Sequence, residues 1–149
     1  MKKLTISILF FFTTIACWAQ QTNKERAVAF YVAINKNNAQ ALESLILPNF
    51  EVYFASQKQT YQGTEFFRFV YETHQRVKGF RQDIKDIFGE GNWVCVTGGA
   101  VGTDPKTGKR FETEFTSVLE FDDNGLIKTQ NIQDNRNVSF QQRSNLVKN

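Results

Sequence analysis

The hydrophobic pattern of this chain changes its period near Gly79, and this change limits the fold more than any other feature. Before it, apolar residues recur at helical spacing over residues 22–34, and again after Asn38 and Thr64, two residues that can cap helices. After it, the pattern alternates with a period of two, most plainly over residues 111–121. Helices followed by consecutive strands are typical of an α+β domain.

Tight turns connect the predicted strands into a mostly antiparallel sheet. Residues 104–109 and 122–125 contain the Pro, Gly, Asp and Asn that are typical of hairpin turns. An earlier strand is expected over residues 50–55, after a second short helix that carries Ile46 and ends before Pro48. The helices must then cover one face of this sheet.

Two details of the strand region bear on the shape of the sheet. The alternation places Phe80, Ile84 and Phe88 on one face of the strand that follows Gly79. The adjacent Gly98 and Gly99 interrupt the next strand, where they predict a bulge that bends the sheet.

The composition describes one ordinary globular domain. The chain has 149 residues and a formal net charge of +3, with 41% hydrophobic and 22% charged residues. Two cysteines and one histidine are too few ligands for a zinc finger or an iron–sulfur cluster, so we expect no metal and no cofactor. No long Lys/Arg tract is present, so we expect no nucleic-acid partner.

The first residues have the order of a secretory signal peptide. A basic start at Lys2 and Lys3 precedes an apolar run over residues 4–16, which is too short for a comfortable membrane anchor. Cleavage after Ala19 would leave 16 basic and 15 acidic residues, a net charge of +1. Lipidation at Cys17 is the alternative. We therefore expect a periplasmic or extracellular protein without a transmembrane segment in its mature form, with a signal peptide over 1–19, a domain over 20–137 and a polar tail over 138–149.

Four segments together resemble the SnoaL-like proteins of the nuclear-transport-factor-2-like superfamily. They are residues 30–31, 45–54, 61–64 and the hairpin of residues 121–127. The resemblance implies a cone: a strongly curved sheet wrapped around N-terminal helices, an apolar pocket at the open end and a homodimer formed through the sheet. The family includes polyketide cyclases, steroid isomerases, dehydratases and epoxide hydrolases.

Two residues are candidates for acid/base chemistry. The resemblance places the acid/base aspartate of the cyclases at Asp134, and a carboxylate in a dry pocket can exchange protons next to a carbonyl. The alternative is a solvated aspartate at the end of a strand. His74, the only histidine, either shuttles protons or simply ends a helix. The steroid-isomerase base has no equivalent, because its position falls at Tyr53 and Phe54.

Aromatic residues on the predicted strands are the candidates for ligand binding. They are Tyr53, Trp93, Phe111 and Phe115. Two functions follow and both stay open at this point. One is a pocket for a small hydrophobic or aromatic molecule, with or without cofactor-independent cyclase-, isomerase- or dehydratase-like chemistry. The other is a non-catalytic module for dimerisation or partner binding.

Overall fold

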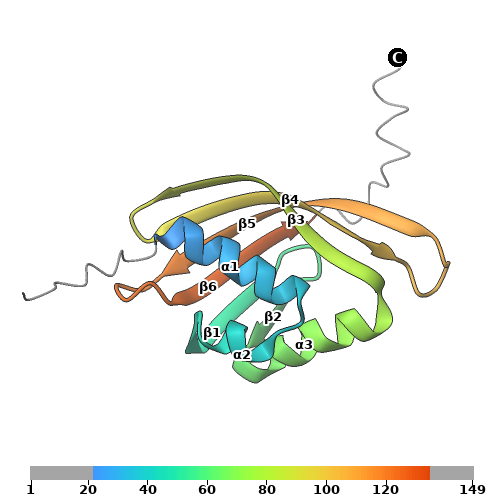
Figure 1. The fold of residues 1–149 in the computed structure, drawn as a ribbon, viewed down its shortest axis with the longest axis horizontal. Coiled ribbons are helices and arrows are strands. Elements are labelled where there is room, and N and C mark those ends of the chain that lie inside the picture. Colours follow the sequence, from blue (N-terminus) through green and yellow to red (C-terminus); the bar gives the residue numbers. More distant parts are fainter. Residues whose placement is uncertain (1–21, 135–149) are drawn as a thin grey trace, which may run out of the picture.

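The computed structural model describes residues 22–134, and these residues confirm the α+β prediction (Figure 1). The predicted signal peptide and the polar tail lie outside the described residues. The elements, in chain order, are α1 (Asn23–Asn35), α2 (Ala39–Glu43), β1 (Ile46–Phe54), β2 (Gln59–Gln62), α3 (Gly63–Arg76), β3 (Lys78–Glu90), β4 (Trp93–Thr103), β5 (Arg110–Phe121) and β6 (Ile127–Asp134).

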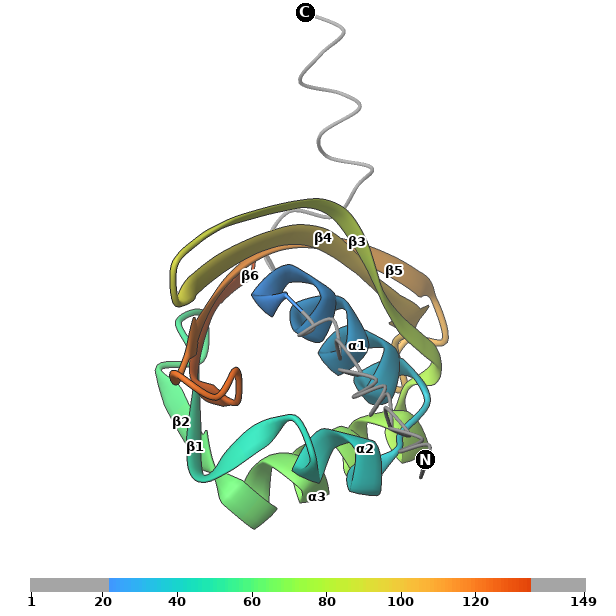
Figure 2. The same ribbon diagram turned by 60° about the vertical axis from the view of Figure 1, so that its left-hand side comes forward.

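The six strands form one mostly antiparallel sheet with the order β2-β1-β6-β5-β4-β3. Only the pairing of β1 with β6 is parallel among these strands. The sheet curves strongly around α1 without closing into a barrel, and α2 and α3 lie across the open side of the curve (Figure 2). The expected curved sheet around the N-terminal helices is therefore confirmed.

Helix α1 fills the concave side of the sheet. It begins with a capping box, in which the Thr22 side chain accepts a hydrogen bond from the backbone N–H of Glu25, and the Glu25 carboxylate accepts one from the Thr22 N–H. Its buried Phe30 ring stacks on Phe66 of α3 at a centroid distance of 5.9 Å and meets Phe50 of β1 edge-on at 6.1 Å. These three rings join both long helices to the sheet.

The first half of the sheet differs from the sequence prediction in two ways. The second helix ends at Glu43, so Ile46 and Pro48 belong to strand β1 rather than to the helix and its end. Strand β2, which was not predicted, pairs Thr60 with Tyr53 at the edge of the sheet. An edge strand with mostly exposed residues lacks the apolar alternation by which strands are predicted.

An irregularity in strand β3 reverses the orientation of its last residues. The register with β4 shifts between Ile84, opposite Gly98, and Asp86, opposite Thr97. The predicted bulge therefore lies at Gly98, but the extra residue is on β3. Because of this shift, Ile87 packs against the core and Phe88 is 59% exposed on the outer face. The prediction that Phe88 shares a face with Ile84 was wrong for this reason.

Candidate functional site

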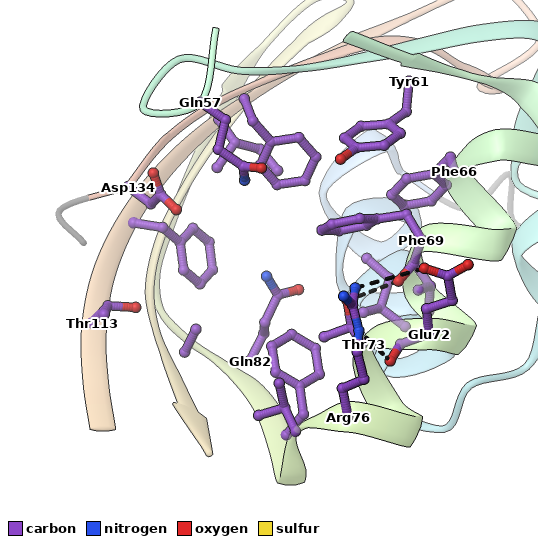
Figure 3. A pocket seen from close by; sticks show the side chains of 18 of the residues that line it. Gln57, Tyr61, Phe66, Phe69, Glu72, Thr73, Arg76, Gln82, Thr113 and Asp134 are labelled. Atoms are coloured by element: carbon purple, nitrogen blue, oxygen red, sulfur yellow. Dashed lines mark hydrogen bonds and ion pairs between the residues drawn. The ribbon is translucent and has the colours of Figure 1, made fainter. Parts of the chain in front are cut away.

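A pocket of about 800 Å³ opens between helix α3 and the concave face of the sheet (Figure 3). Residues of α3 form one wall, and the inward-facing residues of β3, β4, β5 and β6 form the other. The period-two alternation of these strands explains the second wall, because every other side chain points to the same face. The pocket lies within the size range of small-molecule sites.

Aromatic rings line this pocket on both sides. Near helix α3, the rings of Phe54, Tyr61 and Phe69 are in mutual contact, with centroid distances between 4.7 and 5.7 Å. On strand β5, Phe111 and Phe115 line the opposite wall. Figure 3 shows Tyr61 and Phe69 on the helix side and Asp134 across the pocket from them. This arrangement suits a flat apolar molecule.

Two glycines of β4 make room for the aromatic rings of β5. Gly98 is opposite Phe115 in the register, and Gly102 is opposite Phe111. A Cβ atom on Gly98 would lie 2.6 Å from Cζ of Phe115, and one on Gly102 would lie 3.1 Å from Cζ of Phe111. The glycines therefore allow both rings to lie against β4 and shape the pocket wall.

A buried polar cluster lies at the middle of β6, on its inner face. The side-chain Nε2 of Gln130 donates hydrogen bonds to the hydroxyl of Tyr31, at 3.2 Å, and to that of Ser117, at 3.0 Å. All three residues are buried. Burial raises the pKa of the Tyr31 hydroxyl well above its ordinary value, although its hydrogen bonds to Ser117 and Gln130 partly oppose this. Tyr31 is therefore a neutral phenol at physiological pH.

Two carboxamide oxygens at the pocket have no hydrogen-bond partner among residues 22–134. They are Oε1 of Gln82 and Oε1 of Gln130, and both atoms are buried. Both residues line the pocket, and Figure 3 shows the head group of Gln82 near its centre. Two hydrogen bonds to Asn35 on α1 hold the backbone of Gln82 in place. The Gln82 N–H donates to Oδ1 of Asn35, and the Gln82 carbonyl oxygen accepts from Nδ2 of Asn35.

The rim of the pocket on α3 carries an ion-pair series. The carboxylate of Glu72 lies 4.0 Å from Arg68 Nε and 3.6 Å from Arg76 Nη2, one turn away on either side. All three side chains are more than half exposed, so these pairs contribute little to stability. They place polar groups where the pocket meets solvent (Figure 3).

The structure brings together three of the six residues proposed from the sequence. Asp134, Phe111 and Phe115 all line the pocket. Asp134 ends β6 and is half-buried opposite Phe115 in the β5–β6 register. Its position therefore permits a carboxylate to meet a ligand inside the pocket.

His74 lies on α3 but outside the set of pocket residues. Its Nε2 is 2.8 Å from the carbonyl oxygen of Ile34, and since a carbonyl only accepts, the imidazole donates through this nitrogen. Its ring also meets Phe80 edge-on at 5.3 Å. The side chain thus connects α3 to the end of α1.

Tyr53 and Trp93 lie on the outer, convex face of the sheet. Tyr53 is 38% exposed and Trp93 is 53% exposed, and neither lines the pocket. Tyr53 belongs to a row across five strands, in which each residue pairs with the next: Phe88, Cys95, Val118, Asn131 and Tyr53. Four of these five residues are apolar or aromatic.

Gln82, Gln130 and most of the aromatic residues that line the pocket near α3 were not predicted from the sequence as site residues. The alternation along β6 contained a usable clue, because Gln130 and Ile132 share the face of Asp134. The position of Gln82 could not be deduced in this way, since only the curvature of the sheet brings β3 to the same pocket.

Among the described residues, no group of three or more His, Cys, Asp or Glu side chains is placed to hold a metal ion. No helix in this part of the chain is long and apolar enough to cross a membrane.

Residues 27–130 match the sequence model of the SnoaL-like domain, which covers most of the chain. The chain belongs to the SnoaL-like domain family. The resemblance noted from the sequence is thus confirmed, and the family match includes both Gln82 and Gln130 but ends before Asp134. None of the curated proteins matches the chain significantly.

Solved structures show the same fold at low sequence identity. IdmH, a candidate polyketide cyclase from Streptomyces antibioticus, matches with a TM-score of 0.72 and 17% identity, over 83% of this chain and 99% of that one. An NTF2-like protein from Burkholderia thailandensis gives 0.69 and 23%, over 76% and 91%. A hypothetical protein with a ketosteroid isomerase-like fold from Catenulispora acidiphila, in complex with trimethylamine, gives 0.67 and 17%, over 76% and 86%.

Proposed function

We propose that this SnoaL-like domain binds a small, mostly apolar or aromatic molecule in the pocket between α3 and the sheet. The observation that carries the proposal is the aromatic lining of a space of about 800 Å³, in which Gly98 and Gly102 leave room for the rings of Phe115 and Phe111. A flat apolar ligand would bury its surface against these rings, which is the main favourable contribution to binding such molecules.

The binding of pyrene, a flat fluorescent hydrocarbon, tests this proposal. Thr113 lines the pocket on the inner face of β5, whereas Thr116 is exposed on the outer face of the same strand. We expect Thr113→Trp to fill the pocket and weaken pyrene binding about tenfold or more, since lost burial of one ring is worth at least about 1.4 kcal/mol. Thr116→Trp is the matched control. Equal binding by both variants and the unmodified protein would place the pyrene elsewhere and refute the proposal.

We further propose that Asp134 exchanges protons with a ligand bound there. It is the carboxylate contributed to the pocket by the inner face of the sheet, across from the aromatic rings of α3 (Figure 3). A base in this place suits proton removal next to a carbonyl, the elementary step of cyclisation and isomerisation. Proton exchange of an aromatic ketone, compared between the unmodified protein and Asp134→Asn, tests this step.

Export of the chain is the setting we propose for this activity. The basic start, the apolar run and the small residues Cys17 and Ala19 support cleavage and release into the periplasm or the medium. Intact mass spectrometry of the protein recovered from the source cells distinguishes the alternatives. A chain that begins at Gln20 supports soluble export, a lipid-modified chain that begins at Cys17 supports anchoring, and a chain that retains residues 1–19 contradicts both.

A second candidate function is self-association through the outer face of the sheet. The row from Phe88 to Tyr53 favours it, since exposed aromatic residues at both ends of a mostly apolar row form a surface that a second copy can cover. Sedimentation velocity tests it. We expect a dimer that Phe88→Glu combined with Tyr53→Glu converts to a monomer, while Tyr71→Glu on the exposed face of α3 leaves the dimer intact. A monomeric unmodified protein at about 100 μM would refute this candidate.

A further inference from the structure

Two buried carboxamide oxygens of the pocket, which lack a hydrogen-bond partner among residues 22–134, indicate what kind of polar group its ligand carries. Gln130 is only 2% exposed, and within residues 22–134 its Oε1 atom accepts no hydrogen bond. A buried acceptor without a donor is unfavourable, and buried polar groups in folded proteins are rarely left in this state. A ligand that supplies the missing donor would remove this penalty when it binds.

The neighbours of Gln130 determine which atom of its head group is left for a ligand. Both donor positions of Nε2 are used, one by the Tyr31 hydroxyl and one by the Ser117 hydroxyl. The amide nitrogen is therefore fully engaged with the protein, and the oxygen is the remaining polar atom. Since Gln130 lines the pocket, its Oε1 is offered to whatever occupies this part of the pocket.

Gln82 adds a second acceptor of the same kind from another part of the sheet. Its Oε1 atom is also buried and lacks a partner among the described residues. Gln82 is on β3 and Gln130 is on β6, so the two oxygens belong to different sides of the same pocket. Both offer a lone pair to a ligand, and neither offers a proton.

The remaining strand residues of the pocket do not supply a cation. All the strand residues that line it have Phe, Tyr, Ile, Ala, Thr, Gln or Asp side chains, whereas the two arginines of the lining, Arg68 and Arg76, are on α3. A carboxylate, phosphate or enolate end directed at Gln130 would thus meet an acceptor oxygen in place of the donors it needs.

We propose that the ligand of this pocket carries a neutral hydroxyl group on its aromatic or apolar body, and that this hydroxyl enters first and donates to Oε1 of Gln130. Oε1 of Gln82 accepts a second donor where the ligand has one. The hydroxyl is neutral because Gln130, Tyr31 and Ser117 are all uncharged, and a buried charge without a countercharge is strongly disfavoured.

Asp134 is four residues along β6, about 13 Å from Gln130, so it faces the opposite end of the ligand. This inference rests on the pocket function proposed above and names its ligand class.

A matched pair of fluorescent probes tests the inference. They are 1-hydroxypyrene and 1-methoxypyrene, which have the same ring system, and the methyl group of the second removes the donor. We expect the unmodified protein to bind the hydroxyl compound about tenfold more tightly at pH 6.5, the effect of one net hydrogen bond. Gln130→Met keeps the length of the side chain but lacks the acceptor, and should bring the ratio of the two affinities close to one.

Two further variants accompany this measurement. Gln133→Met is the matched control, because Gln133 is exposed on the outer face of the same strand and should leave the ratio unchanged. Gln82→Met removes the other acceptor and should lower the affinity for a dihydroxypyrene more than that for 1-hydroxypyrene. Far-ultraviolet circular dichroism establishes that each variant is folded.

The outcomes separate this inference from the pocket function on which it rests. Equal affinities of the unmodified protein for the two probes, or a preference for the methoxy compound, would overturn the inference and leave the pocket function intact. A preference that survives in Gln130→Met would also overturn it. If pyrene and both of its derivatives fail to bind the unmodified protein, the pocket function and the inference are both wrong. Because the first comparison uses the unmodified protein, the inference is decided even where Gln130→Met does not fold.

Discussion

The ring of Phe115 occupies the space that a side chain on Gly98 would need, on the neighbouring strand directly opposite it. A Cβ atom at Gly98 would be 2.6 Å from Cζ of Phe115, well inside van der Waals contact. Phe115 also stacks on Tyr31 of α1 at a centroid distance of 5.6 Å. Because Gly98 has no side chain, the Phe115 ring has room both to line the pocket and to stack on Tyr31 of α1.

Adding a methyl group at Gly98 should destabilise the protein. We expect Gly98→Ala to lower the free energy of unfolding by about 2 kcal/mol, because the methyl group would overlap the Phe115 ring and the backbone oxygen of Asp83. Gly99→Ala is the matched control, since its Cβ atom would meet nothing closer than the Thr113 carbonyl oxygen at 3.6 Å. Urea unfolding of both variants measures the difference, and equal stabilities would show that the ring moves aside freely.

Raising the pH above 10 should destabilise the protein through Tyr31. Burial raises the pKa of this phenol in the folded state, so ionisation above pH 10 occurs first in the unfolded chain and favours unfolding. The stability that the neutral phenol contributes is therefore complete below pH 10 and falls as the pH rises above it. Between pH 9 and pH 11, we expect the unmodified protein to lose about 1.4 kcal/mol more than Tyr31→Phe does.

Tyr71→Phe is the control for this pH dependence. Tyr71 is exposed on α3, so its removal should leave the pH dependence of the unmodified protein unchanged. Tyr31→Phe should also cost about 1 kcal/mol at pH 7, because the Gln130 amide loses one of its two acceptors. Parallel loss of stability in Tyr31→Phe and the unmodified protein between pH 9 and pH 11 would contradict the assignment to Tyr31.

The side chain of His74 should matter for stability and not for ligand binding. Its hydrogen bond to the Ile34 carbonyl and its contact with Phe80 connect α3 to its neighbours. We expect His74→Ala to lower the free energy of unfolding by about 1–2 kcal/mol and to change pyrene affinity less than twofold. Gln75→Ala, one residue further along the exposed surface, should change neither quantity. Unimpaired stability together with lost activity would instead support the proton-shuttle hypothesis for this residue.

The α+β class and most of the sheet could be predicted because they depend on local patterns. The period-two alternation over residues 111–121 and the turn at residues 122–125 determine a hairpin without reference to the rest of the chain. Strand β2 could not be predicted in this way, since its exposed residues form a strand only by pairing with β1. The orientation of Phe88 was not predicted because the glycines that indicate the bulge are on β4, whereas the extra residue that reverses the alternation is on β3.

The candidate site was predicted in part for the same physical reason. Phe111, Phe115 and Asp134 lie on strands whose inner face can be read from their alternation, although Asp134 also required the family resemblance. Gln82 and Gln130 come from strands that are not neighbours, and they face one pocket only because the sheet curves around α1. Tyr53 and Trp93 were chosen as aromatic strand residues, but the face to which a strand residue points depends on its register.

Replacing the Asp134 carboxylate should abolish proton transfer and preserve binding. A suitable measurement is the exchange of the acidic α-protons of 2-tetralone, an aromatic ketone, in D₂O, followed by proton NMR. A positioned general base accelerates such a step about 100-fold or more. Asp134→Asn has the same size and remains polar, but an amide does not accept a proton at neutral pH. We expect the catalysed exchange to fall to the solvent rate, and pyrene affinity to change less than twofold.

The control for this measurement is Asp86→Asn, an equal change of charge at an exposed position on β3, away from the pocket lining. It should retain the full exchange rate, which would exclude a simple effect of net charge. Exchange by Asp134→Asn at the rate of the unmodified protein would remove the carboxylate from the chemistry, as would an unmodified protein no faster than solvent. In either case the domain would be a binding module, because pyrene affinity reports the pocket independently of any proton transfer.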